Sequence, residues 1–143
     1  MIYGYVRPYS RDEEGWLQNQ LLEKYGVNTI VQEGDFGEGT DEELHDLLEQ
    51  LQPKDTVVVV KLSCLATSSE LLLETLTYFD ENNIRFISLF DEIDTLRLGS
   101  VYLNAIKRMD EFGFDVRSER TRLGIKRNKN KRYLFLNYGF KPW

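Results

Sequence analysis

The sequence predicts an α/β fold, with a mostly parallel sheet of four to five strands in a single domain and helices on both faces. Segments of strand length alternate along the chain with segments whose apolar residues recur at helical spacing. Residues 56–62 form a continuous apolar run, as expected for a strand that a parallel sheet buries on both faces. The length of 143 residues suits one domain with its own core.

The first predicted strand covers residues 2–6, which are rich in Tyr, Ile and Val. Acidic residues at 12–14 suit the start of the first helix, because negative charge is favourable at the positive end of the helix dipole. Apolar residues at helical spacing follow, and Gly26 ends this helix. The second predicted strand covers residues 28–32.

The second predicted helix begins at Thr40, which forms a capping box with Glu43 and precedes a stripe of leucines. The run 56–62 is the third strand. Ser68 or Ser69 caps a third helix, and a fourth strand follows it at 84–90.

The last predicted element is a long helix from about Val101. Its apolar spacing continues past Gly113 into a basic segment, so we divide the chain into a core at 1–100, a helix at 101–132 and an aromatic tail at 133–143. The alternative is a helix that ends near Gly113 and is followed by a disordered basic tail.

Charge is unevenly divided along the chain. Residues 1–115 contain 9 Lys/Arg and 23 Asp/Glu, whereas residues 116–143 contain 9 Lys/Arg and only Glu119 as an acid, so net charges of −14 and +8 make up the formal −6. We expect the acidic part to repel nucleic acid and the basic part to attract it, although a solvated basic tail is the alternative. The predicted DNA contacts are Arg117, Arg120, Arg122, Lys126, Arg127, Lys129, Lys131 and Arg132.

The composition favours a cytoplasmic protein. No apolar run approaches the roughly 20 residues that cross a membrane, and no signal peptide is visible. The single cysteine, Cys64, cannot form an internal disulfide. No neighbouring charge lowers its pKa, so we expect an inert thiol.

Six segments of the chain, in matching order and spacing, resemble the catalytic domain of serine recombinases, the resolvase/invertase family. They read YGYVR with Gln18 eleven residues after Arg7, EGDFGEGT, LLEQLQPKDTVVVVKL, FISLFDEIDT and SERTRLGIKR. The resemblance implies that a serine hydroxyl attacks a DNA phosphodiester while arginines stabilise the developing charge, without a metal or cofactor. It also implies that the long helix forms a dimer interface and that its basic end lies along DNA. The interface residues expected on that helix are Leu103, Ile106, Met109, Phe112 and Val116.

The first catalytic motif of the family, Arg-any residue-Ser, is altered here. The chain reads Arg7-Pro8-Tyr9-Ser10, and the spacing from Arg7 to Gln18 places Tyr9 at the nucleophile position. Ser10 lies one residue late. A slip in the turn would bring Ser10 into place, and this is the alternative that we keep open, together with attack by Tyr9.

The second motif of the family reads Lys-Leu-Asp-Arg-Leu, then Gly or Ser, then Arg. This chain has KLSCLAT at residues 61–67, so Ser63 replaces the aspartate, and Cys64 and Thr67 replace the arginines. A further family arginine falls on or near Asp41, which reverses the charge beside the phosphate site.

These replacements predict an inactive site, because loss of a single preorganised charge donor costs about 10²–10³ in rate. We therefore expect a catalytically inactive, dimeric, DNA-associated regulator or accessory subunit, whose partners are itself, DNA or an active recombinase. Two alternatives remain. One is an active recombinase that uses Ser10, and the other is a protein-binding module that uses the acidic surface.

Overall fold

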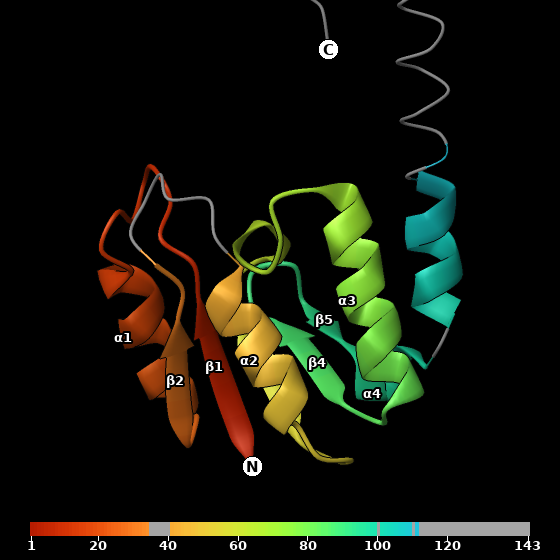
Figure 1. Cartoon of the computed structure of the whole chain (residues 1–143), viewed down its shortest axis with the longest axis horizontal. Coiled ribbons are helices and arrows are strands. Elements are labelled where there is room, and N and C mark those ends of the chain that lie inside the picture. Colours follow the sequence, from red (N-terminus) through yellow and green to blue (C-terminus); the bar gives the residue numbers. More distant parts are fainter. Residues whose placement is uncertain (35–40, 100, 110, 112–143) are drawn as a thin grey trace, which may run out of the picture. The chain divides into compact units, whose positions relative to one another are not determined.

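The computed structural model describes residues 1–34, 41–99, 101–109 and 111. Residues 1–106 form one compact unit, and a second unit begins at Lys107. In the first unit, five strands form one sheet in the order β2-β1-β3-β4-β5 (Figure 1). Their bounds are β1 (Ile2–Val6), β2 (Thr29–Gln32), β3 (Thr56–Val59), β4 (Arg85–Ser88) and β5 (Ile93–Asp94). The first four strands are parallel and β5 runs antiparallel to β4, so the predicted α/β class and mostly parallel sheet are confirmed.

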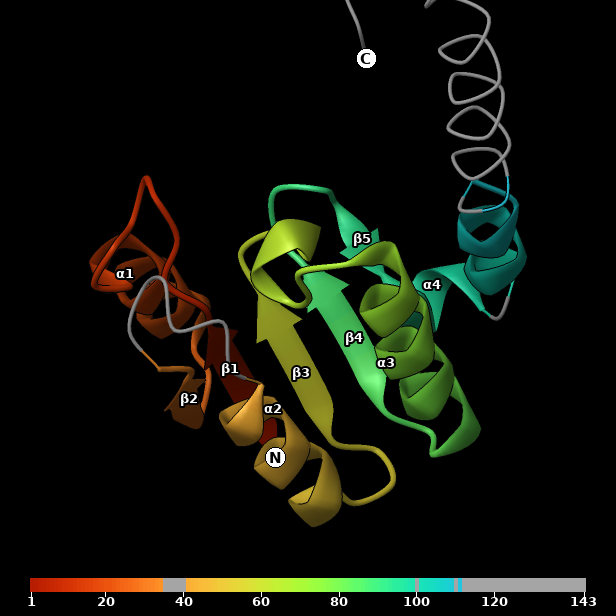
Figure 2. The same ribbon diagram turned by 45° about the horizontal axis from the view of Figure 1, so that its top comes forward.

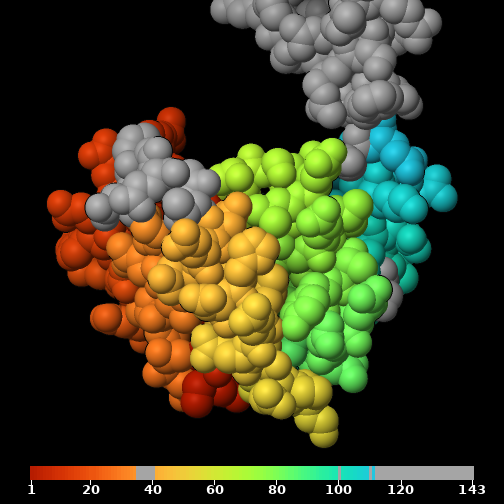
Figure 3. All heavy atoms as spheres, in the orientation of Figure 1, coloured from red at the N-terminus to blue at the C-terminus, as the bar shows by residue number. Residues whose placement is uncertain are grey.

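Helices cover both faces of the sheet, as the alternating sequence pattern predicts. The helices are α1 (Trp16–Tyr25), α2 (Glu42–Gln50), α3 (Ser69–Glu81) and α4 (Thr95–Leu98), with a 3₁₀ helix, η1 (Leu62–Cys64), directly after β3. Helix α1 packs on one face, while α2 and α3 lie side by side over the other (Figures 1 and 2). The space-filling view shows the side chains of α2 and α3 covering this second face (Figure 3).

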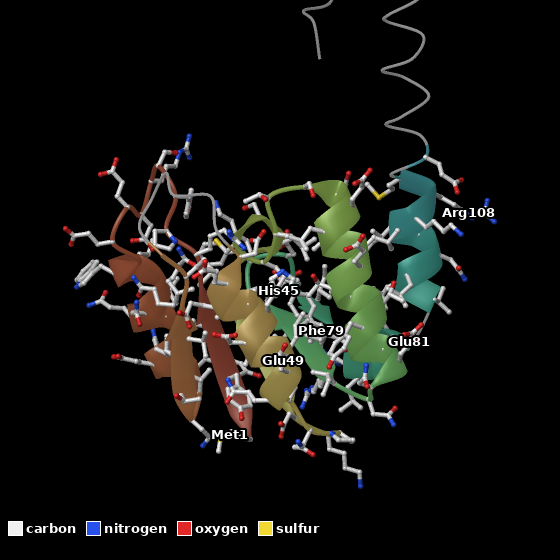
Figure 4. The ribbon with its side chains drawn as sticks, in the orientation of Figure 1. Met1, His45, Glu49, Phe79, Glu81 and Arg108 are labelled. Atoms are coloured by element: carbon white, nitrogen blue, oxygen red, sulfur yellow. The ribbon has the colours of Figure 1, made fainter. Side chains whose placement is uncertain are left out.

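Each face of the sheet carries its own apolar cluster, because successive strand residues point to opposite sides. Val57 of β3 belongs to the cluster beneath α2 and α3, and Val58 belongs to the cluster beneath α1. Phe79 of α3 stacks on Phe86 of β4 with ring centroids 5.7 Å apart (Figure 4). Thus β3 is buried on both faces, as its continuous apolar run predicts.

Two helices begin differently from the sequence expectation. Helix α1 starts at Trp16 rather than within 12–14, because residues 9–12 form a tight turn and Gly15 adopts a left-handed conformation with φ of 73°. Helix α2 starts at Glu42, and the predicted capping residue Thr40 lies outside the described residues. The third helix matches its prediction, since the hydroxyl oxygen of Ser68 accepts a hydrogen bond from the amide of Leu71.

Strand β3 also ends earlier than expected. It stops at Val59 rather than at residue 62, because the chain enters η1 at Leu62. The amide of Leu62 donates to a carboxylate oxygen of Asp91 at 2.8 Å, and this bond fixes the turn to the loop after β4.

A further helix covers residues 101–109. Tyr102, Leu103 and Ile106 are half-buried and pack against the cluster beneath α2 and α3. Met109 lies in the second unit. Phe112, Val116, the basic residues 117–132 and the aromatic tail 133–143 lie outside the described residues. In the described part of the chain, no helix combines the length and apolar character of a membrane span.

Candidate active site

The two altered motifs meet at the carboxyl edge of the sheet. Strands β1 and β3 are neighbours, and the connections that follow them diverge, since α1 lies on one face and α3 on the other. Ligand sites of open α/β sheets lie where the connections diverge in this way. Residues 7–12 leave this edge after β1 and residues 61–67 leave it after β3, as the arrowheads of the strands indicate (Figure 2).

Residues 9–12 of the first motif form a tight turn. The amide of Tyr9 donates to the carbonyl of Asp12 at 3.3 Å, and the amide of Asp12 donates to the carbonyl of Tyr9 at 2.9 Å. Ser10 and Arg11 therefore occupy the tip of the turn and are exposed. Tyr9 is half-buried at the base of the same turn.

Arg7 is buried and its charge is paired inside the chain. Its residue surface is 6% exposed. The Nη2 atom donates to the hydroxyl of Tyr5 at 2.9 Å and to a carboxylate oxygen of Asp41, and it lies 3.5 Å from the carbonyl oxygen of Leu65. The guanidinium carbon lies 5.7 Å from the ring centroid of Tyr5. Arg7 thus joins β1, the start of α2 and the segment after η1.

Glu33 extends this buried network and caps α2. The hydroxyl of Tyr5 donates to Glu33 at 2.7 Å. The amides of Glu43 and Leu44 each donate to its carboxylate at 3.1 Å. These amides belong to the first turn of α2, where no helical partner is available, so Glu33 fulfils the role that the sequence assigned to Thr40.

The buried environment shifts both partners of the Tyr5–Glu33 bond. Burial, and then the hydrogen bond to Glu33, raises the pKa of Tyr5 well above its ordinary value. Burial acts to raise the pKa of Glu33, but the hydrogen bonds from Tyr5 and from the amides of α2 outweigh it and lower that pKa overall. The tyrosine is therefore a neutral donor and Glu33 an ionised acceptor at neutral pH.

Asp12 performs the same capping role for α1. Its carboxylate accepts hydrogen bonds from the amides of Leu17 and Gln18, each at 3.0 Å, and the residue is 8% exposed. The side chain of Gln18 is buried and bonds back to the main chain of Arg7. Asp12 and Gln18 together fix the first motif to α1.

The second motif carries little reactive chemistry. Cys64 is 1% exposed, and burial raises the pKa of its thiol, so the thiolate is disfavoured at neutral pH. Ser63 and Thr67 are exposed and uncharged.

Lys61 brings the two motifs into contact. Its Nζ atom lies 4.5 Å from the ring centroid of Tyr9, at cation–π distance. A hydrogen bond with Tyr9 is the largest cause that raises the pKa of Lys61. Lys61 and Tyr9 therefore hold each other at the edge where a nucleophile would act.

The sequence had no signal for most of this network. Glu33 caps α2 from ten residues away, so no local capping pattern marks it. Its position directly after β2, at the edge where the other motifs lie, was the available signal. Asp12 lies just before α1, and the acidic residues at 12–14 did mark it as a residue of the helix start. Over the described ranges, no three His, Cys, Asp or Glu side chains are grouped so as to hold a metal ion.

Comparison with known proteins identifies the family. The model of the family "Resolvase, N terminal domain" matches residues 2–133. The transposon Tn917 resolvase of Enterococcus faecalis is 32% identical over 128 residues, which cover 88% of this chain and 70% of that protein. The serine recombinase gin of Escherichia phage Mu is 33% identical over 133 residues, covering 92% of this chain and 69% of that protein.

Solved structures agree with these sequence matches. The N-terminal catalytic domain of TP901-1 integrase superposes with a TM-score of 0.68 at 27% identity and covers 80% of this chain and 97% of that one. A resolvase family site-specific recombinase from Streptococcus pneumoniae gives a TM-score of 0.63 at 17% identity over 88% of this chain and 97% of that one, a likeness of fold alone. The chain therefore belongs to the resolvase family of serine recombinases, whose N-terminal domain it matches over most of its length.

Proposed function

We propose that this protein is a catalytically inactive member of the resolvase family that acts in the cytoplasm as a dimeric, DNA-associated regulator or accessory subunit. The observation that carries the proposal is the ion pair of Arg7 with Asp41. The resemblance to serine recombinases implies that the positive charge of Arg7 would face the scissile phosphate. Here its charge is already bound by the carboxylate of Asp41, and a second carboxylate, Glu33, belongs to the same hydrogen-bond network.

The remaining chemistry of the site supports the same proposal. Tyr9 stands at the nucleophile position, and Cys64 replaces a family arginine with a buried, neutral thiol. Ser63 and Thr67 supply no charge. In the transition state of phosphoryl transfer the equatorial oxygens carry negative charge that positive groups must stabilise, and each missing donor costs about 10²–10³ in rate.

The DNA part of the proposal draws on relatives and on charge. Proteins named as resolvase, serine recombinase and DNA-invertase are about one-third identical to this chain. Residues 116–143 contain 9 Lys/Arg and one acid, in contrast to the acidic body. We propose that this basic segment, at residues 117–132, contacts DNA phosphates. We also propose that Met109, Phe112 and Val116 contribute to self-association, together with the parts of Leu103 and Ile106 that their own core leaves exposed.

A covalent-adduct assay tests the loss of catalysis. The protein would be incubated with supercoiled plasmids that carry the DNA flanking its gene, and the reaction would be stopped with detergent to trap protein–DNA links. We expect neither nicked DNA nor adducts, whereas an active relative on its own site gives both. An adduct that disappears in Ser10→Ala or in Tyr9→Phe would overturn the proposal and identify the nucleophile.

A gel shift over a range of salt concentrations tests DNA association. If the protein binds DNA phosphates, its affinity for DNA should fall steeply as the salt concentration rises. In a plot of the logarithm of affinity against that of salt concentration, the slope should be close in size to the number of phosphates neutralised. Replacing Lys126, Arg127 and Lys129 with glutamine should weaken binding and flatten this slope. The exposed Lys24 and Lys54 of the acidic body provide the matched control. Absence of binding at low salt would remove the DNA part and favour the protein-binding alternative.

A further inference from the structure

Three groups that could receive an anion at the carboxyl edge of the sheet are already occupied by carboxylates of the chain itself. The first amides of α1 are bound by Asp12, and those of α2 are bound by Glu33. The guanidinium of Arg7 is bound by Asp41. Helix N-termini and buried arginines are the usual receptors for phosphate in proteins, and here these three are bound internally.

We propose that Asp41 is an internal ligand of Arg7 that keeps phosphate groups out of the site. This inference deepens the proposed function, on which it rests, because it states how the former phosphate site is closed. The Asp41 side chain is 26% exposed while that of Arg7 is 7% exposed, so Asp41 lies on the solvent side of the pair. An external anion would therefore have to displace Asp41 to reach the guanidinium.

Displacement is unfavourable for two reasons. Asp41 is held beside Arg7 by the fold, so its carboxylate competes as an intramolecular ligand against an anion from solution. A phosphate that entered beside it would also meet the charges of Asp41 and Glu33 across a poorly solvated space, where like charges repel strongly. Asp41→Asn removes the competing charge and leaves the contacts of Arg7 with Tyr5 and Leu65 in place.

The experiment compares three versions of the full chain: wild type, Asp41→Asn and Asp46→Asn. Asp46 is exposed on the same helix, so Asp46→Asn makes the same change of charge away from Arg7. Inorganic phosphate would be titrated into each protein, labelled with ¹⁵N-arginine, while the guanidinium resonances of Arg7 are followed. The basic segment is the same in all three proteins, so a difference between them at Arg7 reports on the site.

We expect phosphate to shift the Arg7 resonances in Asp41→Asn, with an apparent affinity about tenfold or more above that of the wild type, as expected when a charge-assisted bond becomes available. Wild type and Asp46→Asn should behave alike. Equal apparent affinities for phosphate at Arg7 in all three proteins would overturn the inference.

The outcomes separate this inference from the proposed function. A covalent DNA adduct of the wild-type protein would overturn the proposed function. An Arg7 signal that phosphate leaves unchanged in Asp41→Asn, with no adduct in the wild type, would overturn the inference alone.

Discussion

Gln18 binds the main chain of Arg7 through both ends of its side-chain amide. Its Oε1 accepts from the amide of Arg7 at 3.2 Å, and its Nε2 donates to the carbonyl of Arg7 at 2.9 Å. The two hydrogen bonds resemble those that a neighbouring strand would make, and they lie where β1 ends. Gln18 is 1% exposed. The spacing between these two residues, which the sequence comparison singled out, is therefore a structural constraint that does not depend on catalysis.

Substituting Gln18 should reduce stability. Gln18→Leu leaves the buried amide and carbonyl of Arg7 without their partners, at a cost of at least about 2 kcal/mol in the free energy of unfolding. Urea unfolding followed by circular dichroism measures this loss. The exposed Gln20 on the same helix supplies the control Gln20→Leu, which should change stability by less than about 0.5 kcal/mol. Equal effects of the two variants would contradict this account.

Two glycines provide a matched test of local packing. Gly15 and Gly26 have φ of 73° and 104°, so alanine at either position strains the backbone by about 1–2 kcal/mol. A Cβ at Gly15 would also lie 2.6 Å from Cγ1 of Val6, whereas a Cβ at Gly26 meets no atom within 4 Å. Gly15→Ala should therefore be less stable than Gly26→Ala by about 1–3 kcal/mol. Thermal unfolding of the two variants makes the comparison, and identical melting temperatures would exclude the contact with Val6.

Glu33 should make stability depend on acid pH. Its pKa is lowered in the folded chain, so its contribution is present above the ordinary pKa of about 4.3 and is lost as pH falls through the lower folded value. Glu33→Gln should be less stable than wild type at pH 7 by about 1–2 kcal/mol, and the difference should shrink below about pH 4.

Urea unfolding at a series of pH values measures this dependence. Glu49, which is exposed on the outer face of α2 (Figure 4), supplies the control Glu49→Gln. The control should follow the wild type at every pH. The capping role of Glu33 would be contradicted if the free energy of unfolding of the wild type exceeded that of Glu33→Gln by the same amount at pH 3 and pH 7.

Cys64 should be protected from modification. The thiol is buried and its pKa is raised, so both access and thiolate formation are disfavoured. Iodoacetamide at pH 8 should react with it about 10²-fold or more slowly in the folded protein than in urea, because reaction needs local opening. Mass spectrometry over time measures both rates. Rapid labelling of the folded protein would place Cys64 in an open site and contradict the closed one described above.

Most of the fold could be predicted from periodicity. The three longer helices have apolar residues at a repeat of 3.6, and the four parallel strands have a repeat of two or a continuous apolar run. These patterns reflect burial directly. Strand β5 has two residues and α4 has four, which is too short for a period to appear. Their positions come from tertiary bonds, such as the pair of Arg85 with Asp94 at 2.6 Å and the bond from the amide of Phe86 to Thr95 at 2.9 Å.

The candidate site could be predicted only in part. Parallel strands that are neighbours bring their carboxyl ends together, so the meeting of residues 7–12 with 61–67 follows from the strand order. The family resemblance also placed a reversed charge, Asp41, beside this edge. The bond from Arg7 to Asp41 joins residues 34 positions apart, and that from Leu44 to Glu33 joins residues 11 positions apart, so no local pattern encodes either.

The ion pair of Arg7 with Asp41 also constrains the evolutionary history of the chain. The family resemblance assigns an arginine to this position, and Asp41→Arg would replace the partner of a buried cation with a second cation. Removing one partner from a buried pair is strongly destabilising, by about 3–5 kcal/mol. Asp41→Arg alone should therefore yield a less stable chain. Under the proposed loss of catalysis, a return to strand cleavage would need several substitutions together.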